Sequence, residues 1–127
     1  SGVFDMVFWA HKLALMGLLA ATLAFGYGRL SHRMRDAMRA GRVPVDRSEG
    51  PEVQHHMGFT LYFACAWCVA NALWAELMAW HLLSRGPGFR VAWAVTIVLG
   101  AGAVISGLRA IAAWAQARRS QGMAGVG

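Results

Sequence analysis

The chain has 127 residues, of which 57% are hydrophobic and 14% are charged, and its mean hydropathy is +0.44. Soluble domains carry about a quarter of charged residues, so this composition excludes an ordinary soluble domain and indicates a single integral membrane domain over residues 1–127. The net charge of +6 and the isoelectric point near 10.7 do not require nucleic-acid binding, because membrane topology accounts for the arginines.

Three apolar stretches predict an all-α protein with three transmembrane helices, at approximately 10–30, 58–83 and 90–114. Each stretch is long enough, at ~1.5 Å per residue, to cross a hydrocarbon core of about 30 Å. Residues 31–57 are predicted to form a cytoplasmic loop that starts as an amphipathic extension of the first helix and is stopped by Gly41.

The loop beyond Gly41 contains two prolines and alternating charges, which predict an irregular connector. The C-terminal tail from Ser120 is expected to be frayed. The stretch before the first helix carries Asp5 where a secretory signal would have a basic start, so we expect no cleaved signal there.

The basic residues predict the orientation of the helices. Nine of the 12 lie in the 31–57 loop, at its start or at the end of the third helix, whereas Lys12, Arg85 and Arg90 lie on the other side. By the positive-inside rule, the loop and the C-terminus are cytoplasmic and the N-terminus is outside. We therefore predict a multi-pass protein of the cell inner (plasma) membrane.

Each predicted helix carries one ridge of mostly small residues, which lets helices approach closely in lipid. The ridges comprise Ala10, Ala14, Gly17, Ala21, Ala24 and Gly28 on the first helix, Gly58, Leu61, Cys65, Cys68, Ala72, Glu76 and Ala79 on the second, and Ala92, Thr96, Gly100, Ala103, Gly107 and Ala110 on the third. We expect the three ridges to meet in a tight bundle; the alternative is that one ridge faces another subunit.

Glu76 and Thr96 are the intramembrane polar residues that these ridges bring to similar depth. A carboxylate inside a membrane is a candidate functional group and needs a partner. We predict a hydrogen bond between Glu76 and either Thr96 or a backbone carbonyl of the first helix near Gly17, or an approach by Arg85 or Arg90. Glu76 then either stabilises the bundle or takes part in proton transfer or in the binding of a quinone or a cation.

The histidines are candidate cofactor ligands. His11 and His81 lie near the outer face, where they could hold haem b or another pigment, although His81 points away from the ridge and would need a partner subunit. His11 and His32 are 21 residues apart, roughly 32 Å along a helix, which argues against two stacked haems in the core. The alternatives are interfacial anchoring and, for His32, His55 and His56, a metal at the cytoplasmic face.

Two further motifs on the second helix can be explained either by structure alone or by a function. Cys65 and Cys68 form a C-x-x-C sequence, but their place on the ridge favours packing over redox chemistry. An aromatic face of the same helix is either a wall facing lipid or a docking surface for a transmembrane subunit, a carotenoid or a quinone tail. This face comprises Phe63, Trp67, Trp74 and Met78.

The sequence contains no recognisable catalytic constellation, and no catalytic residues are predicted. The leading hypothesis is a small accessory or anchor subunit of a respiratory or photosynthetic electron-transfer complex, which packs against other transmembrane subunits and borders a quinone or haem site. The alternatives are a small transporter or channel that uses Glu76 and a membrane enzyme that acts on a lipophilic substrate.

Overall fold

The computed structural model describes residues 2–45, 50–79 and 87–126. These residues form three α-helices, α1 (Gly2–Arg39), α2 (Pro51–Ala79) and α3 (Pro87–Val126), without a strand in the described ranges. All three helices are long and apolar enough to cross a membrane. The predicted all-α membrane fold is therefore confirmed.

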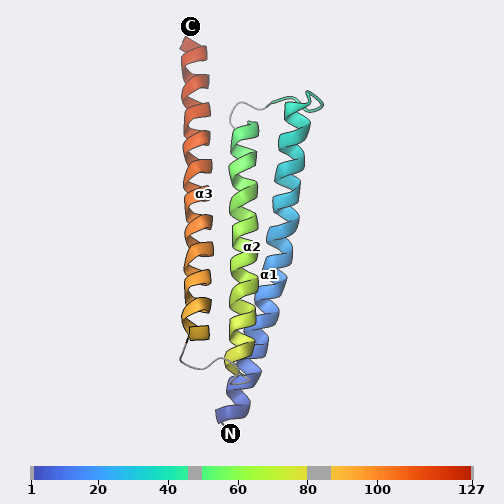
Figure 1. The fold of residues 1–127 in the computed structure, drawn as a ribbon. Helices are drawn as coiled ribbons and strands as arrows, with labels where there is room; N and C mark the ends of the chain where they lie inside the picture. The colour runs from blue at the N-terminus through green and yellow to red at the C-terminus, as the bar shows by residue number, and fades with distance from the viewer. Residues whose placement is uncertain (1, 46–49, 80–86, 127) are drawn as a thin grey trace.

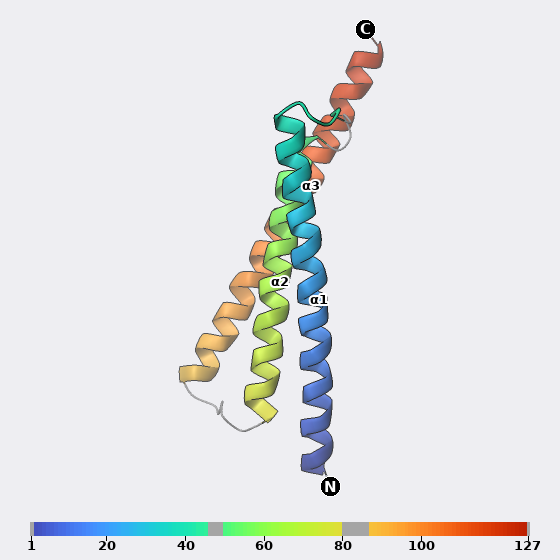
Figure 2. The same ribbon diagram turned by 90° about the vertical axis from the view of Figure 1, so that its right-hand side faces the viewer.

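The helices lie in an open row with α2 in the middle (Figure 1). Both outer helices contact α2, but α1 and α3 do not approach each other anywhere in the part of the chain that the structure describes. Seen from the side, α1 runs along α2 whereas α3 crosses it at an angle and diverges from it near the start of α3 (Figure 2). The expected closed bundle is thus wrong: two helices pack on opposite sides of a third.

The predicted extension of the first helix is a direct continuation of α1, which runs without a break to Arg39. Gly41 ends it with φ of 74°, a left-handed conformation that only glycine adopts without strain. The backbone N–H of Gly41 donates to Met38 O (3.2 Å) and that of Arg42 donates to Ala37 O (2.9 Å). This pattern is a Schellman motif, and the predicted stop at Gly41 is confirmed.

Two helix boundaries differ from the prediction. The second helix begins at Pro51, inside the predicted connector, because proline fits the first turn of a helix, where its missing N–H has no partner to lose. As a result His55 and His56 lie on α2 and not on a loop. The tail that was expected to fray is helical up to Val126, and no proline stops the helix before that residue.

Small residues form the interface between α1 and α2. Ala14 and Ala21 on α1 are 4% and 3% exposed, and Ala72 on α2 is 5% exposed. A Cβ added at Gly17 would lie 3.3 Å from Cys68 O and 3.4 Å from Ala72 Cβ. The ridges predicted for the first two helices therefore meet each other, which allows the two backbones to approach closely.

Glycines of α3 pack against large side chains of α2. A Cβ added at Gly102 would lie 2.7 Å from the Phe63 ring, and one at Gly100 would lie 3.4 Å from Trp67 Nε1. The α3 glycines thus face the aromatic side of α2 and not its small-residue ridge, which α1 already occupies. Because α1 packs on the ridge of α2 and α3 packs on its aromatic side, the two outer helices lie on different sides of α2 and the row stays open.

Candidate functional site

His11 on α1 and Glu76 on α2 meet near one end of the apolar segments of the two helices. His11 Nδ1 lies 2.5 Å from Glu76 Oε1, and the side chains are 59% and 28% exposed, respectively. An imidazole N–H can donate to a carboxylate whether the ring is neutral or charged. The pair links α1 to α2 and gives the intramembrane carboxylate a partner.

The His11–Glu76 pair borders an apolar groove between α1 and α2 of about 410 Å³. Buried alanines, Ala14 and Ala72, line it together with longer and more exposed side chains. The longer side chains are Leu15, Leu18, Val69 and Leu73. Apart from the pair, the described residues of this lining are apolar, so this part of the groove has apolar walls and one polar end.

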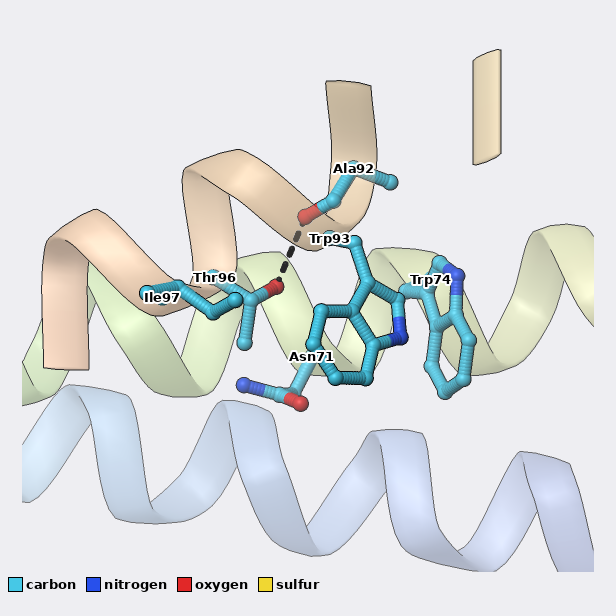
Figure 3. Close-up of a pocket in the computed structure, with 6 residues that line it drawn as sticks. All are labelled: Asn71, Trp74, Ala92, Trp93, Thr96 and Ile97. Atoms are coloured by element: carbon cyan, nitrogen blue, oxygen red, sulfur yellow. Dashed lines mark hydrogen bonds between the residues drawn. The ribbon is translucent and has the colours of Figure 1, made fainter. Parts of the chain in front are cut away.

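Thr96 lies on the other side of α2 from this groove. It lines a pocket of about 300 Å³ with Asn71, Trp74 and Trp93 (Figure 3). Its hydroxyl donates to Ala92 O on its own helix (2.9 Å), and not to the carboxylate that we predicted as its partner. The sequence placed Glu76 and Thr96 on facing ridges, but the row turns them to opposite sides of α2. Of the two arginines predicted as partners, Arg85 lies outside the described residues and Arg90 is exposed near the start of α3.

A second polar cluster joins α1 and α2 at the arginine-rich end of the row. Arg35 Nη1 lies 2.8 Å from His55 Nδ1, and His32 Nε2 lies 3.2 Å from the backbone oxygen of His55. The guanidinium has no acceptor, so His55 Nδ1 must be the acceptor and carries no proton in this arrangement. Arginine donation from α1 therefore fixes the tautomer of a histidine on α2.

The His32 ring is enclosed by α2. Its centroid is 5.0 Å from the ring centroids of both Phe59 and Tyr62, in edge-on geometry. A Cβ added at Gly58 would overlap the His32 ring, so only glycine leaves room for the imidazole there. The alternative of a metal at these histidines finds no support, since no group of three potential metal ligands lies together among the described residues. His32, His55 and His56 instead take part in stacking and hydrogen bonding.

The polar contacts at the arginine-rich end extend to Glu52 on the first turn of α2. Its carboxylate lies 4.0 Å from Arg39 Nη2 and 3.7 Å from His56 Nε2. Both distances are long for hydrogen bonds, and the Glu52 side chain is 72% exposed, so the contribution of these contacts to stability is small. Sequence reasoning missed Arg35 and Glu52 as partners because it placed the start of α2 too late.

The two polar clusters are equally spaced on both helices. His11 and His32 are 21 residues apart on α1, as are His55 and Glu76 on α2. Antiparallel helices bring such equal spacings into register, which is why each end has one cluster. The equal spacing is present in the sequence. It becomes informative only if the first two helices are assumed to pack against each other.

The remaining candidate residues have mixed outcomes. Cys65 and Cys68 are half-buried and not disulfide-bonded, and their role in packing stays a prediction. Phe63 and Trp67 lie against α3 of the same chain, so the proposed docking surface is partly an internal interface. The side chain of Met78 and all of His81 lie outside the described residues, and neither can be placed.

The chain has no match among protein-family models, curated proteins or solved structures. Its function must therefore be argued from its own geometry.

Proposed function

We propose that this chain is a small accessory subunit of a multi-subunit inner-membrane complex of the electron-transfer class, respiratory or photosynthetic. The observation that carries the proposal is the open row. The described parts of α1 and α3 do not meet, so the helices do not surround a central space. A chain of this shape fits between larger neighbours better than it encloses a substrate on its own.

The outer helices present large apolar side chains on their free sides. On α1, Leu19 and Leu23 are 64% and 56% exposed, and on α3, Val98 and Leu108 are 65% and 61% exposed. In a bilayer, lipid tails solvate such side chains as well as protein does, so association with a neighbour depends on shape and polar contacts. Protruding side chains with a groove between them offer that shape to another transmembrane helix.

The arrangement of arginines supports an orientation with the N-terminus outside and the C-terminus cytoplasmic. Arg29, Arg33, Arg39 and Arg42 are exposed at one end of α1, and Arg118 and Arg119 are exposed near the end of α3. These ends lie on the same side of the row (Figure 1). The positive-inside rule places that side in the cytoplasm.

The electron-transfer class is favoured by the histidines at both ends of the apolar region. His11 is 59% exposed in its side chain and lies on the α1–α2 groove, where it can approach a haem or a quinone held by a neighbour. Imidazole is a common haem ligand and a hydrogen-bond partner for small polar groups. The proposal therefore assigns to this chain a border of a cofactor site and no catalysis of its own.

The experiment is purification of the tagged chain from its native membrane in a mild detergent. We expect a complex of fixed stoichiometry that contains other transmembrane subunits and shows the absorption of haem or another redox pigment. Leu108→Trp and Leu23→Trp enlarge the free sides and should lower the yield of this complex, whereas Gly26→Ala, where an added Cβ meets no atom within 4 Å, should not. A chain that purifies only alone or with copies of itself would contradict the proposal.

A second candidate function is transport by a homo-oligomer, and the His11–Glu76 pair favours it. A polar pair between two apolar helices can lie on an ion or proton pathway. Proteoliposomes that contain only this chain should then conduct protons or cations, and Glu76→Gln should abolish the flux while the helices stay folded. Absence of flux in the wild-type chain would remove this candidate.

A further inference from the structure

We propose that the groove between α1 and α2 binds a lipophilic quinol, with a ring hydroxyl at the His11–Glu76 pair and the isoprenoid tail along the apolar walls. This inference rests on the proposed subunit role for its place in an electron-transfer complex. The binding itself depends only on residues of this chain and can be tested separately from partner subunits.

The shape of the groove follows from the residues that line it. Ala14 and Ala72 form the floor of the groove and are almost completely buried, at 4% and 5% exposure. Leu15 and Leu73 are 64% and 60% exposed and rise on either side. The volume of about 410 Å³ lies within the usual range of about 300–1,000 Å³ for small-molecule sites.

The polar end of the groove can form hydrogen bonds with a neutral head group. The carboxylate of Glu76 is a strong acceptor, and His11 is oriented by its Nδ1 contact with that carboxylate. His11 Nε2 forms no hydrogen bond to any residue that the structure describes, so it remains available to a ligand. A ring hydroxyl can donate to the carboxylate of Glu76, and when His11 Nε2 carries a proton the same hydroxyl can accept from it.

The chemistry of the pair selects against other lipids. A phospholipid phosphate or a fatty-acid carboxylate would bring negative charge to Glu76 within an apolar groove, where repulsion is poorly screened. Both would also need cationic partners, and the described residues that line the groove include no lysine or arginine. A quinol ring carries neutral hydroxyl groups on a flat apolar body, which matches a groove with a single polar end.

The test is photolabelling of the full chain in lipid nanodiscs with an azido derivative of a short-chain ubiquinol. We expect the label on peptides that contain residues 11–18 or 69–76 and not on α3. Unlabelled ubiquinol should compete with the label, whereas a saturated alcohol of equal length should not. Competition distinguishes binding in the groove from simple partitioning into lipid.

Three variants identify the contacts. His11→Phe removes the imidazole, and Glu76→Gln replaces the carboxylate with a neutral amide that is a weaker acceptor; each should lower specific labelling about three- to tenfold. Leu73→Trp should block the groove without touching the pair, and should lower labelling as well. The matched controls are Ile111→Trp, at an equally exposed position on α3, and Thr96→Val, on the other side of α2; both should label like the wild type.

Equal labelling of all three helices, or equal competition by the saturated alcohol, would overturn the inference and identify the groove as a site for any acyl chain. Unchanged labelling of Leu73→Trp would overturn it as well. A complex with redox partners but without groove labelling would contradict the inference alone. Groove labelling in a chain that has no partners would contradict the proposed subunit role alone.

Discussion

The two faces of α2 use different means to hold their neighbours. Towards α1, small residues meet small residues, and a polar cluster closes each end of the contact: His11 with Glu76, and Arg35 with His55. Towards α3, glycines receive aromatic rings. The side chains of Asn71 and Thr96 on that side of the row donate within their own helices, to Trp67 O and Ala92 O.

This difference determines which aspect of helix packing, register or distance, each interface fixes. Hydrogen bonds at two ends of a contact fix the register of α1 against α2, because sliding one helix by a turn would separate both clusters. Ring-into-glycine packing fixes how close α3 approaches but carries little directional information. We therefore expect α1 and α2 to behave as one unit to which α3 is attached by shape.

The largest expected effect is that of Gly58→Ala, which places a methyl group on the His32 ring. The ring has little freedom to move, because it is held by the His55 backbone oxygen and enclosed by aromatic neighbours. We expect overpacking to lower the free energy of unfolding by about 1–3 kcal/mol, measured by denaturant titration in detergent micelles.

Gly26→Ala is the control for that substitution, since a Cβ there meets no atom within 4 Å. It should leave the free energy of unfolding unchanged or slightly higher. Equal loss of stability in both variants would mean that glycine matters at these sites for helix flexibility and not for the fit of His32.

The next effect is that of Gly102→Ala, which crowds the Phe63 ring at the α2–α3 interface. Phe63 can move more easily than the enclosed His32, so we expect a loss of about 1 kcal/mol. Crosslinking between engineered cysteines on α2 and α3 should fall, while crosslinking between α1 and α2 should stay constant.

Phe63→Leu should restore part of the α2–α3 crosslinking in the Gly102→Ala background, because the smaller side chain makes room for the new methyl group. If the double variant loses more α2–α3 crosslinking than the two single variants lose together, direct packing between these residues is contradicted.

The smallest effect is the coupling between His11 and Glu76. In a double-mutant cycle with His11→Phe and Glu76→Gln, we expect a coupling of about 0.6 kcal/mol, typical of side-chain hydrogen bonds inside membranes. The same cycle with Thr96→Val in place of Glu76→Gln should give no coupling. A coupling of equal size in both cycles would show that His11 acts through the whole row and not through the carboxylate.

The sequence was sufficient for the helices and for one of the two interfaces. Apolar length predicted three spans, and the spacing of Ala14, Gly17 and Ala21 predicted the face that packs on α2. The glycine at 41 predicted the end of α1, because few other residues adopt positive φ. These features depend on local sequence and helical periodicity alone.

The neighbour of each face could not be predicted in the same way. Helical periodicity shows that α3 has a small-residue side, but in lipid such a side accepts either another small ridge or a bulky ring. Because α1 packs on the ridge of α2, the aromatic face of α2 remains for α3, and Phe63 and Trp67 pack against glycines of α3 there. The partner of Glu76 was missed for the same reason, since Thr96 was placed beside it and His11 was not.

The equal spacing of the two polar clusters also sets a length. Twenty-one residues correspond to about 32 Å of helix, close to the thickness of about 30 Å of a typical hydrocarbon core. A thinner bilayer would tilt the α1–α2 pair or draw one cluster into headgroups, and a thicker one would pull both clusters into lipid tails. The stability of the α1–α2 helix pair should therefore depend on membrane thickness, and it should be greatest in bilayers whose apolar layer matches that length.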